Sequence, residues 1–272
     1  MRIRLPRRQR KAYILYAIAS DPTFTFMPRV NLGIAPPTEG RAGSMNAAHP
    51  PANRTSRTPG NAPDMRWERA FWQSGLRHVA GVDEVGRGAM AGPLVAAAVV
   101  FPACEGSALR RLRSALGGVR DSKMLTAAQR VALLAPIERC AVAVAVGVVP
   151  VAEIDHLGLG PANRIAMERA VNALALEVDA LVIDACVLDL ECPQSGLIDG
   201  DALSTSIAAA SIVAKVTRDR MMTALGDEDP RYGFELHKGY CSEYHKARLA
   251  EYGPCVHHRR CFAPVAAWQR DL

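Results

Sequence analysis

Two apolar runs joined by a short acidic and glycine-rich link constrain the fold of this chain more than any other feature. The runs cover residues 79–83 and 94–101 and read as neighbouring strands, and the second is almost continuously apolar, which indicates burial on both faces. The first run ends in Asp83 and Glu84, and the flexible sequence Gly-Arg-Gly follows at 86–88. The fold therefore has to hold two adjacent carboxylates at the end of a buried strand, beside a basic loop.

The link also carries a specific chemistry. Carboxylates are the hard oxygen ligands that Mg²⁺ and Mn²⁺ prefer, and a glycine-rich loop exposes backbone N–H groups that suit a phosphodiester. Adjacent strand residues point to opposite faces, so Asp83 and Glu84 can serve one site only at a strand end or a bulge. The combination predicts metal-assisted phosphoryl transfer. Two surface acids at a turn are the structural alternative.

The rest of the chain alternates between strand and helix patterns. A third β-rich run covers 141–149, and a short buried strand is expected at 180–184, whereas 186–198 reads as a hairpin or loop. Thr126 begins a helix with capping-box spacing that runs to about Arg139. This order indicates an α/β fold with a mixed sheet. The other expected helices cover residues 161–177, 204–225 and 242–251.

Composition divides the chain into two parts. Residues 1–65 carry ten Lys and Arg against three Asp and Glu, a net charge of +7, whereas residues 66–272 carry 23 against 24, a net charge of −1. The first part is rich in proline and lacks the apolar residues of a core, so we expect a basic, disordered extension before a catalytic domain over residues 66–272. We expect residues 1–64 to be dispensable for folding and catalysis. Because the excess positive charge lies in the extension, the high isoelectric point is no evidence that the folded part binds nucleic acid.

Cysteines and hydropathy indicate the compartment. The seven cysteines form no C-x-x-C pair, which fits reduced thiols, and no apolar run approaches the length of a membrane span. The apolar stretch 15–19 after a basic start faintly resembles a targeting peptide, but it is short and has no clear cleavage pattern. We expect a cytoplasmic protein with no membrane partner. The run from Cys255 to Cys261 suggests zinc, but it lacks a second ligand cluster, so a loop with incidental thiols is expected.

Two further acids extend the candidate site. Asp184 ends the apolar run 180–183, a position where α/β folds place functional residues. Asp201 lies just before the helix expected from residue 204, where an acid is also favourable as a helix cap. Asp199 competes with Asp201 as the ligand.

Six short segments carry a more specific signal. They are GVDEVGRG at 81–88, AGP at 91–93, DSK at 121–123, GDALS at 200–204, SIAAASIVAKVTRDR at 206–220 and HKGY at 237–240. Together and in this order they resemble the ribonuclease HII family, over about residues 78–265. No single one of the six would be specific.

The resemblance implies both a fold and an activity. The fold is an RNase H-like mixed five-stranded sheet flanked by helices, with a helical C-terminal part. The activity is that of a metal-dependent endoribonuclease on RNA–DNA hybrids and on DNA with embedded ribonucleotides. It cuts on the 5′ side of the ribonucleotide and leaves 5′-phosphate and 3′-hydroxyl ends. The four acids that match the family's site are Asp83, Glu84, Asp184 and Asp201.

The chemistry of these four acids fits bound cations independently of the resemblance. Four carboxylates would overload a small site with negative charge unless cations were present. Two Mn²⁺ or Mg²⁺ ions, roughly 3.5–4 Å apart, can activate water and relieve charge on the leaving oxygen. We expect Asp83 and Asp184 to be the central ligands and Glu84 and Asp201 to flank them.

Selection for RNA requires a group that senses the 2′-hydroxyl. In the family, the Gly-Arg-Gly loop and the tyrosine of the His-Lys-Gly-Tyr segment recognise the RNA–DNA junction. The matching junction residues here are Gly86, Arg87, Gly88 and Tyr240. The expected phosphate contacts are Lys123, Lys215 and Lys238. Of these, Lys215 has an alternative role, because Arg218 and Asp219 share its helix on a face that reads as solvated and self-paired.

One departure and two alternatives stay open. Ala185 occupies a position where glycine is usual in the family, which leaves the local backbone geometry open. A ribonuclease HIII-like enzyme is the nearer alternative, although that family has a structured N-terminal domain and lacks this Gly-Arg-Gly form. A non-catalytic protein that binds RNA–DNA hybrids is the other, and the presence of all four acids argues against it. We expect a monomer.

Overall fold

A mixed five-stranded sheet forms the centre of residues 62–268, the part of the chain that this computed structural model describes. The strand order is β3-β2-β1-β4-β5. β1 runs antiparallel to β2, β2 runs antiparallel to β3, and β4 and β5 add in parallel on the other side. The strands are β1 (Val79–Val85), β2 (Leu94–Val100), β3 (Ala143–Val149), β4 (Ala180–Asp184) and β5 (Gln194–Leu197).

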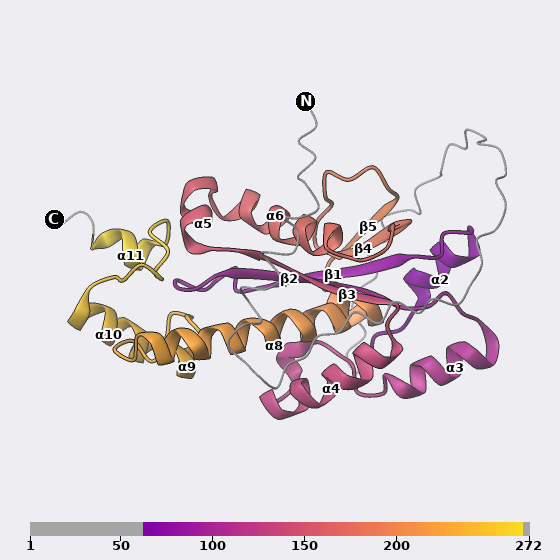
Figure 1. The fold of residues 1–272 in the computed structure, drawn as a ribbon, viewed down its shortest axis with the longest axis horizontal. Coiled ribbons are helices and arrows are strands. Elements are labelled where there is room, and N and C mark those ends of the chain that lie inside the picture. Colours follow the sequence, from indigo (N-terminus) through magenta and orange to yellow (C-terminus); the bar gives the residue numbers. More distant parts are fainter. Residues whose placement is uncertain (1–61, 269–272) are drawn as a thin grey trace.

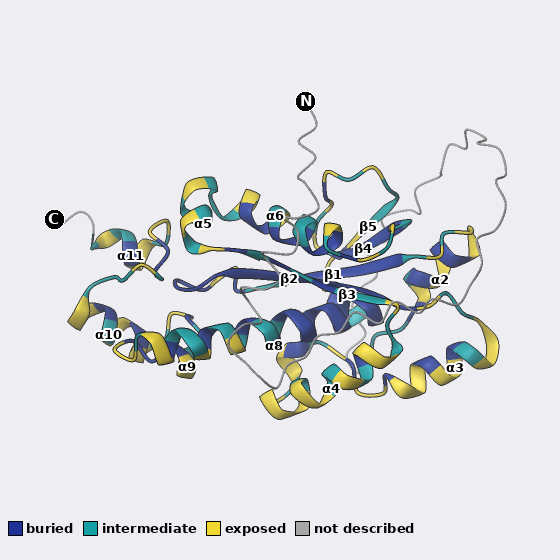
Figure 2. Ribbon diagram, in the orientation of Figure 1, coloured by how far each residue is buried: buried dark blue, intermediate teal, exposed yellow. Residues whose placement is uncertain are grey.

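Helices cover both faces of the sheet. Figure 1 shows α5 (Val151–Leu157) and α6 (Leu159–Asn172) on one face, and the long α8 (Thr205–Glu228) on the other. α4 (Ala127–Cys140) lies outside α8, and α3 (Gly106–Ala115) lies beside α4. Each face has its own apolar core, and Figure 2 shows that the central strands β1, β2 and β4 and the first half of α8 are almost wholly buried. This layering explains the apolar runs in the sequence, because strands with helices on both sides have no polar face.

Small residues let α8 lie close to the sheet. A side chain at Gly81 of β1 would collide with Ser206 of α8. The first turns of α8 are rich in Ala and Ser, and Ser204 caps the helix by accepting a hydrogen bond from the Ile207 amide at 3.2 Å. The close approach fixes where the N-terminus of α8 lies relative to β1.

The C-terminal part is helical and returns to the loop between β1 and β2. It contains α9 (Phe234–His237), α10 (Glu243–Tyr252) and α11 (Ala263–Ala267). The Gly239 carbonyl accepts hydrogen bonds from the amides of Met90 and Ala91, and Ala91 forms an antiparallel bridge with His258. The loop after β1 is therefore joined directly to the segment around Tyr240.

Most expected elements are confirmed, with two corrections. The capping box of Thr126 and Gln129 is present at the start of α4. Residues 186–198 do not form a hairpin: β5 pairs in parallel with β4, and its sequence Gln-Ser-Gly-Leu has no apolar pattern that would reveal a strand. The helix expected over 161–177 is α6, which begins and ends earlier. The short helices not expected are α2 (Arg66–Gln73), α7 (Gly200–Leu203), α3, α5, α9 and α11.

Two expectations concern the ends of the chain and the membrane. The disordered extension is expected over residues 1–65, and residues 1–61 of it lie outside the described residues. Asp64 forms a parallel bridge with Ser204 beside α7. Between residues 62 and 268, no helix is both long enough and apolar enough to cross a bilayer.

Candidate active site

Three carboxylates meet where β4 ends beside β1. Asp83 and Glu84 lie on β1 and Asp184 is the last residue of β4, and each offers an oxygen within 4.8 Å of the others. The strand register explains the meeting, because Ile183 pairs with Val82 and Asp184 then reaches the level of Asp83. Asp83 is buried, whereas Glu84 and Asp184 are partly exposed.

The two neighbouring acids approach the cluster from opposite faces of the sheet. The Ser211 hydroxyl of α8 interacts with Asp83, and the Asn163 amide of α6 interacts with Glu84. β1 continues past both residues to Val85, so no bulge turns them together. They serve one site because β4 ends at Asp184, which leaves space at the carboxyl end of this strand for both side chains.

Local hydrogen bonds orient the carboxylates. Asp83 Oδ1 accepts from the Glu84 amide at 2.7 Å, and Asp184 Oδ1 accepts from the Gly200 amide at 2.7 Å. Ala185, directly after Asp184, has a left-handed backbone with a φ of 54°. That conformation explains why glycine suits this position, and alanine adopts it here with some strain.

Burial and mutual repulsion raise the pKa values of the three acids. Burial raises the pKa of Asp83 well above its ordinary value, and the charges of Glu84 and Asp184 raise it further. The pKa of Glu84 is raised by burial and then by Asp184. Burial also raises the pKa of Asp184, against the hydrogen bond from the Gly200 amide. A set of hard oxygen donors that repel one another fits a divalent cation.

Asp201 lies next to this cluster but is paired with a lysine. It is buried in the first turn of α7, and its Oδ2 accepts from Lys123 Nζ at 3.3 Å. Burial raises its pKa, the charge of Lys123 opposes this, and Asp184 is close enough to raise it further. Asp199 is the N-cap residue of α7 instead, with a φ of 55° and no capping bond from its side chain. The structure thus brings Asp201 to the edge of the three-carboxylate set, not into it.

Two buried arginines shape the loop after β1. Arg259 donates to the carbonyl oxygens of Gly86 at 2.6 Å and Gly92 at 2.9 Å. Arg218 donates to the Lys238 carbonyl at 2.8 Å, and also to the carbonyls of Ala91 and Pro93. Within residues 62–268 neither guanidinium forms an ion pair with a carboxylate. Burial, together with the charge of Arg218, lowers the pKa of Arg259 to about 10. The loop therefore rests on two buried guanidinium groups whose direct hydrogen-bond partners, among the described residues, are carbonyl oxygens.

The expectation for the α8 face was therefore wrong in part. Arg218 is fully buried and not on a solvated face, since it bonds to loop carbonyls. The expected self-pairing does exist between Lys215 and Asp219, whose Nζ and Oδ1 atoms are 2.7 Å apart. Gly86 has a φ of 90°, and a side chain there would collide with the Arg218 guanidinium. Gly86 is thus required by the protein's own packing, whereas Arg87 is exposed and Gly88 faces open space.

Tyr240 lies on the exposed side of this arginine layer. Its ring is 5.5 Å from Lys215 Nζ and 5.4 Å from the Arg218 guanidinium carbon. The residue is 36% exposed, so part of it is accessible to a ligand. Lys238 Nζ donates to Thr223 Oγ1 at 2.8 Å, which directs it along α8. The structure gathers Tyr240, Lys215 and Lys238 along α8 between its middle and Thr223, and Lys123 joins the acids through Asp201.

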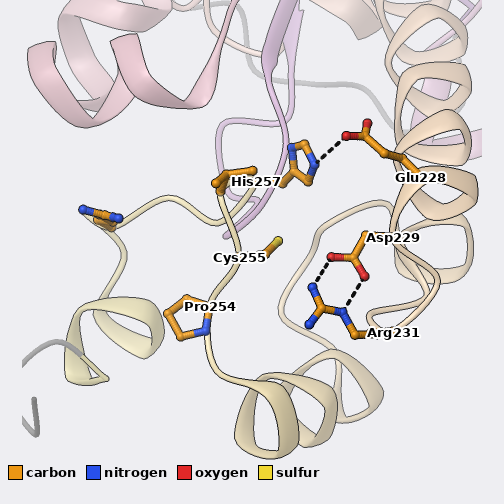
Figure 3. Close-up of a pocket in the computed structure, with 8 residues that line it drawn as sticks. Glu228, Asp229, Arg231, Pro254, Cys255 and His257 are labelled. Carbon is orange, nitrogen blue, oxygen red and sulfur yellow. Dashed lines mark hydrogen bonds and ion pairs between the residues drawn. The ribbon is translucent and has the colours of Figure 1, made fainter.

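A charged pocket near the C-terminus is separate from these acids. Figure 3 shows it between the end of α8 and the loop around Cys255, with Asp229 paired to Arg231 and Glu228 facing His257. The zinc hypothesis for this loop gains nothing. In the described part of the chain, the side chains that lie close enough together to share a metal ion are Asp83, Glu84 and Asp184, and none of them belongs to this loop.

Comparison with known proteins gives the family. The family model for ribonuclease HII matches residues 80–265. A ribonuclease HII from Roseiflexus castenholzii is 50% identical over 207 residues, which are 76% of this chain and 91% of that protein. The crystal structure of ribonuclease H2 from Pyrococcus horikoshii superposes with a TM-score of 0.61 at 30% identity, covering 71% of this chain and 97% of that one. Bst-RNase HIII in complex with Mn²⁺ shares the fold, with a TM-score of 0.56 at 20% identity over 79% and 77% of the two chains.

The fold and the acidic edge of the sheet define an RNase H-like, divalent-metal-dependent nuclease. The chain belongs to the ribonuclease HII family. It is a metal-dependent endoribonuclease that acts on RNA–DNA hybrids, and the expected fold class is confirmed.

Sequence reasoning missed the residues that support the site. Arg259, Asn163 and Ser211 contact the loop or the acids, and none of them was singled out. Ser211 also bonds to Ser122 of the Asp-Ser-Lys segment, with the two Oγ atoms 2.9 Å apart. The signal that was available is that Ser211 and Ser122 both lie in the segments that resemble the family, and that Ser211 is a polar residue amid apolar neighbours.

Proposed function

We propose that this protein cuts duplex DNA at single embedded ribonucleotides as well as long RNA–DNA hybrids, and leaves 5′-phosphate and 3′-hydroxyl ends. The observation that carries the proposal is the cluster of Asp83, Glu84 and Asp184 beside a loop whose backbone rests on two buried arginines. The acids suit phosphodiester hydrolysis, and the loop suits a nucleic-acid backbone.

We propose that two divalent ions, Mn²⁺ or Mg²⁺, are held with Asp83 and Asp184 as the central ligands and Glu84 and Asp201 flanking them. When bound, such ions supply an activated water and relieve charge on the leaving oxygen. The raised pKa values of these acids support this, because cations nearby remove the repulsion between them. The Mn²⁺ bound by Bst-RNase HIII, which shares the fold, is consistent with this choice. Lys123 neutralises Asp201 and lies ready to contact a phosphate once Asp201 turns to a cation.

Substrate recognition follows from the surface around Tyr240. We propose that Arg87 and the backbone of Gly86 and Gly88 contact the sugar–phosphate backbone at the junction. Tyr240 then presents its open ring face to the sugar or base that carries the 2′-hydroxyl. The lysines on this surface are proposed phosphate contacts: Lys123, Lys215 and Lys238.

We further propose that the protein works as a monomer in the cytoplasm and that residues 66–272 are its catalytic domain. Light scattering on a sizing column tests the first point, since a monomer of this chain has a mass of 29.3 kDa. Twice that mass would contradict it.

The proposal is tested by mapping the cut. A labelled DNA duplex with one ribonucleotide is incubated with Mn²⁺ or Mg²⁺, and a parallel sample contains EDTA. We expect one cut on the 5′ side of the ribonucleotide, a ligatable 3′-hydroxyl after phosphatase-free recovery, and no product in EDTA. Cleavage of long hybrids alone would refute the embedded-ribonucleotide claim, and binding without any cleavage would favour the non-catalytic alternative.

A further inference from the structure

The main chain of Tyr240 is held by a line of hydrogen bonds that runs through two buried histidines. Tyr240 O lies 2.9 Å from His245 Nδ1, and His245 Nε2 lies 3.1 Å from His258 Nε2. His258 Nδ1 is 3.1 Å from the Cys255 amide nitrogen and 3.2 Å from Cys255 Sγ. Both imidazoles are essentially inaccessible to solvent, at 0% and 1% exposure. The line therefore runs from Cys255 through the protein interior to the backbone of the junction tyrosine.

Each proton in this line has only one consistent position. A carbonyl oxygen can only accept, so His245 carries its proton on Nδ1. A neutral His245 then has an accepting Nε2, and His258 must donate to it from its own Nε2. That leaves His258 Nδ1 as an acceptor, which matches the two donors that Cys255 directs at it. Every bond is satisfied only while both rings are neutral and the tautomers alternate.

The electrostatics agree with neutral rings. Burial, together with the charges of neighbouring histidines, lowers the pKa of His245 and of His258 to about 4. The aromatic ring of Phe234 packs against both imidazoles, with ring centroids 5.6 Å apart in each case.

A third histidine supports the same segment from the other side. His237 Nε2 donates to the Tyr232 carbonyl at 2.9 Å, and its Nδ1 accepts from the Gly239 amide at 3.2 Å. Its ring stacks on that of His245, with the ring centroids 4.0 Å apart and the ring planes 15° from parallel. The Tyr240 amide donates to the His237 carbonyl at 3.0 Å. The backbone of Tyr240 is thus held at both its N–H and its C=O.

We propose that His245 and His258 are positioning residues that fix the backbone of Tyr240 and so set its ring against the RNA–DNA junction. This rests on the proposed function, in which Tyr240 reads that junction. The histidines do not touch the substrate; they act through the backbone of a tyrosine whose ring lies beside Lys215 and Arg218.

Two substitutions of His258 separate this role from simple packing. His258→Gln retains an amide donor near the position of Nε2 and is expected to keep the bond to His245, whereas His258→Leu removes it. We expect kcat/KM on a single embedded ribonucleotide to fall about tenfold in His258→Leu, the size of one buried hydrogen bond, and to stay within about threefold in His258→Gln. His257→Gln is the matched control, because its neighbouring ring faces Glu228 at the pocket of Figure 3.

A double-mutant cycle with Tyr240→Ala tests whether the effect passes through the tyrosine. If His258 acts on the substrate only by placing Tyr240, then His258→Leu costs little more once the ring is gone. A full tenfold loss in the Tyr240→Ala background would overturn the proposal, as would equal losses for His258→Leu and His258→Gln at matched thermal stability.

A readout without substrate keeps the proposal distinct from the proposed function. The imidazole ¹⁵N chemical shifts of the full chain should show His245 protonated on Nδ1 and His258 protonated on Nε2, and His258→Leu should speed amide exchange at Tyr240. The opposite tautomers, or unchanged exchange, would refute the line of bonds. If the tautomers are as expected but Tyr240→Ala cleaves at the wild-type rate, the proposed role of Tyr240 has failed and the positioning of its backbone has not.

Discussion

Replacing Asp83 with asparagine should stabilise the metal-free protein while it destroys activity. Asp83 is 4% exposed, and its carboxylate lies within 4.8 Å of oxygens of Glu84 and Asp184. Asparagine retains an oxygen that can accept from the Glu84 amide, so the local hydrogen bond survives. What the substitution removes is a buried negative charge that its neighbours repel.

The magnitude follows from the geometry. Two unit charges 4.8 Å apart repel by about 3.5 kcal/mol at an effective dielectric constant of about 20. Partial protonation of the cluster, shown by the raised pKa values, already removes part of this repulsion. We therefore expect a gain of about 1–3 kcal/mol in the free energy of unfolding, which is about 3–10 °C in Tm for a domain of this size.

The gain has a defined pH dependence. The folded-state pKa of Asp83 is raised above its unfolded value of 3.8, so the ionised carboxylate destabilises the fold. This cost is absent well below pH 3.8, where the group is protonated in both states. It grows as the pH rises above 3.8 and reaches its full size once the pH has passed the folded-state pKa. The stabilisation by Asp83→Asn should therefore be large at pH 8 and vanish near pH 3.5 if the fold persists there.

Thermal melting in EDTA and in Mn²⁺ is the assay. Wild type should gain stability from Mn²⁺, because a ligand that binds only the folded state raises Tm, and Asp83→Asn should lose most of that gain. Asp227→Asn, at an exposed acid of α8, is the matched control and should behave as wild type. A lower Tm for Asp83→Asn in EDTA, or an undiminished response to Mn²⁺, would refute the reasoning.

Three further predictions concern the ends of the chain, a strained residue and the junction tyrosine. A chain that begins at Ala62 should melt and cleave like the full protein. One that begins at Met65 should melt a few degrees lower, because it loses the backbone bonds of Asp64 to Leu203 and Thr205; loss of activity in the Ala62 chain would contradict the expectation that residues 1–64 are dispensable for catalysis. Ala185→Gly should raise the free energy of unfolding by about 0.5–1 kcal/mol in denaturant titrations, since it relieves a left-handed alanine; a loss of stability would show that alanine is not strained there. Tyr240→Ala should cleave a single embedded ribonucleotide more slowly than Tyr240→Phe if the ring packs on the sugar or base, whereas an early loss in Tyr240→Phe would assign the role to the hydroxyl; wild-type rates for both, at unchanged Tm, would leave Tyr240 as a packing residue.

The sequence predicts the sheet well because its strands are buried on both faces. Runs such as 94–101 have no polar period, and the capping box at Thr126 has a specific spacing, so both are visible without the structure. β5 is not, because pairing with β4 makes it a strand and its own residues do not. Short helices such as α5 and α9 lack the length that gives an amphipathic period.

The site is predictable as a set of residue types but not as a geometry. Because Asp83 and Glu84 are adjacent in the sequence, a bulge or a strand end was expected there. The two acids instead project from opposite faces of β1 and meet because β4 ends beside them. Arg218 and Arg259 illustrate the limit more sharply. Their partners are carbonyl oxygens, which every residue has, so no side-chain pattern in the sequence marks the loop they support. The histidine line behind Tyr240 depends in the same way on backbone positions.

The most direct test of the central claim is the cleavage of a single-ribonucleotide duplex by Asp184→Asn, with binding of the uncleaved duplex measured in parallel. Asparagine preserves the acceptor for the Gly200 amide, so the variant should fold and bind as wild type does. The account predicts at least about a hundredfold loss of cleavage rate in saturating Mn²⁺ and in saturating Mg²⁺, with the dissociation constant changed less than about threefold. Cleavage near the wild-type rate in either metal would contradict the assignment of the acidic edge of β1 and β4 as the catalytic centre.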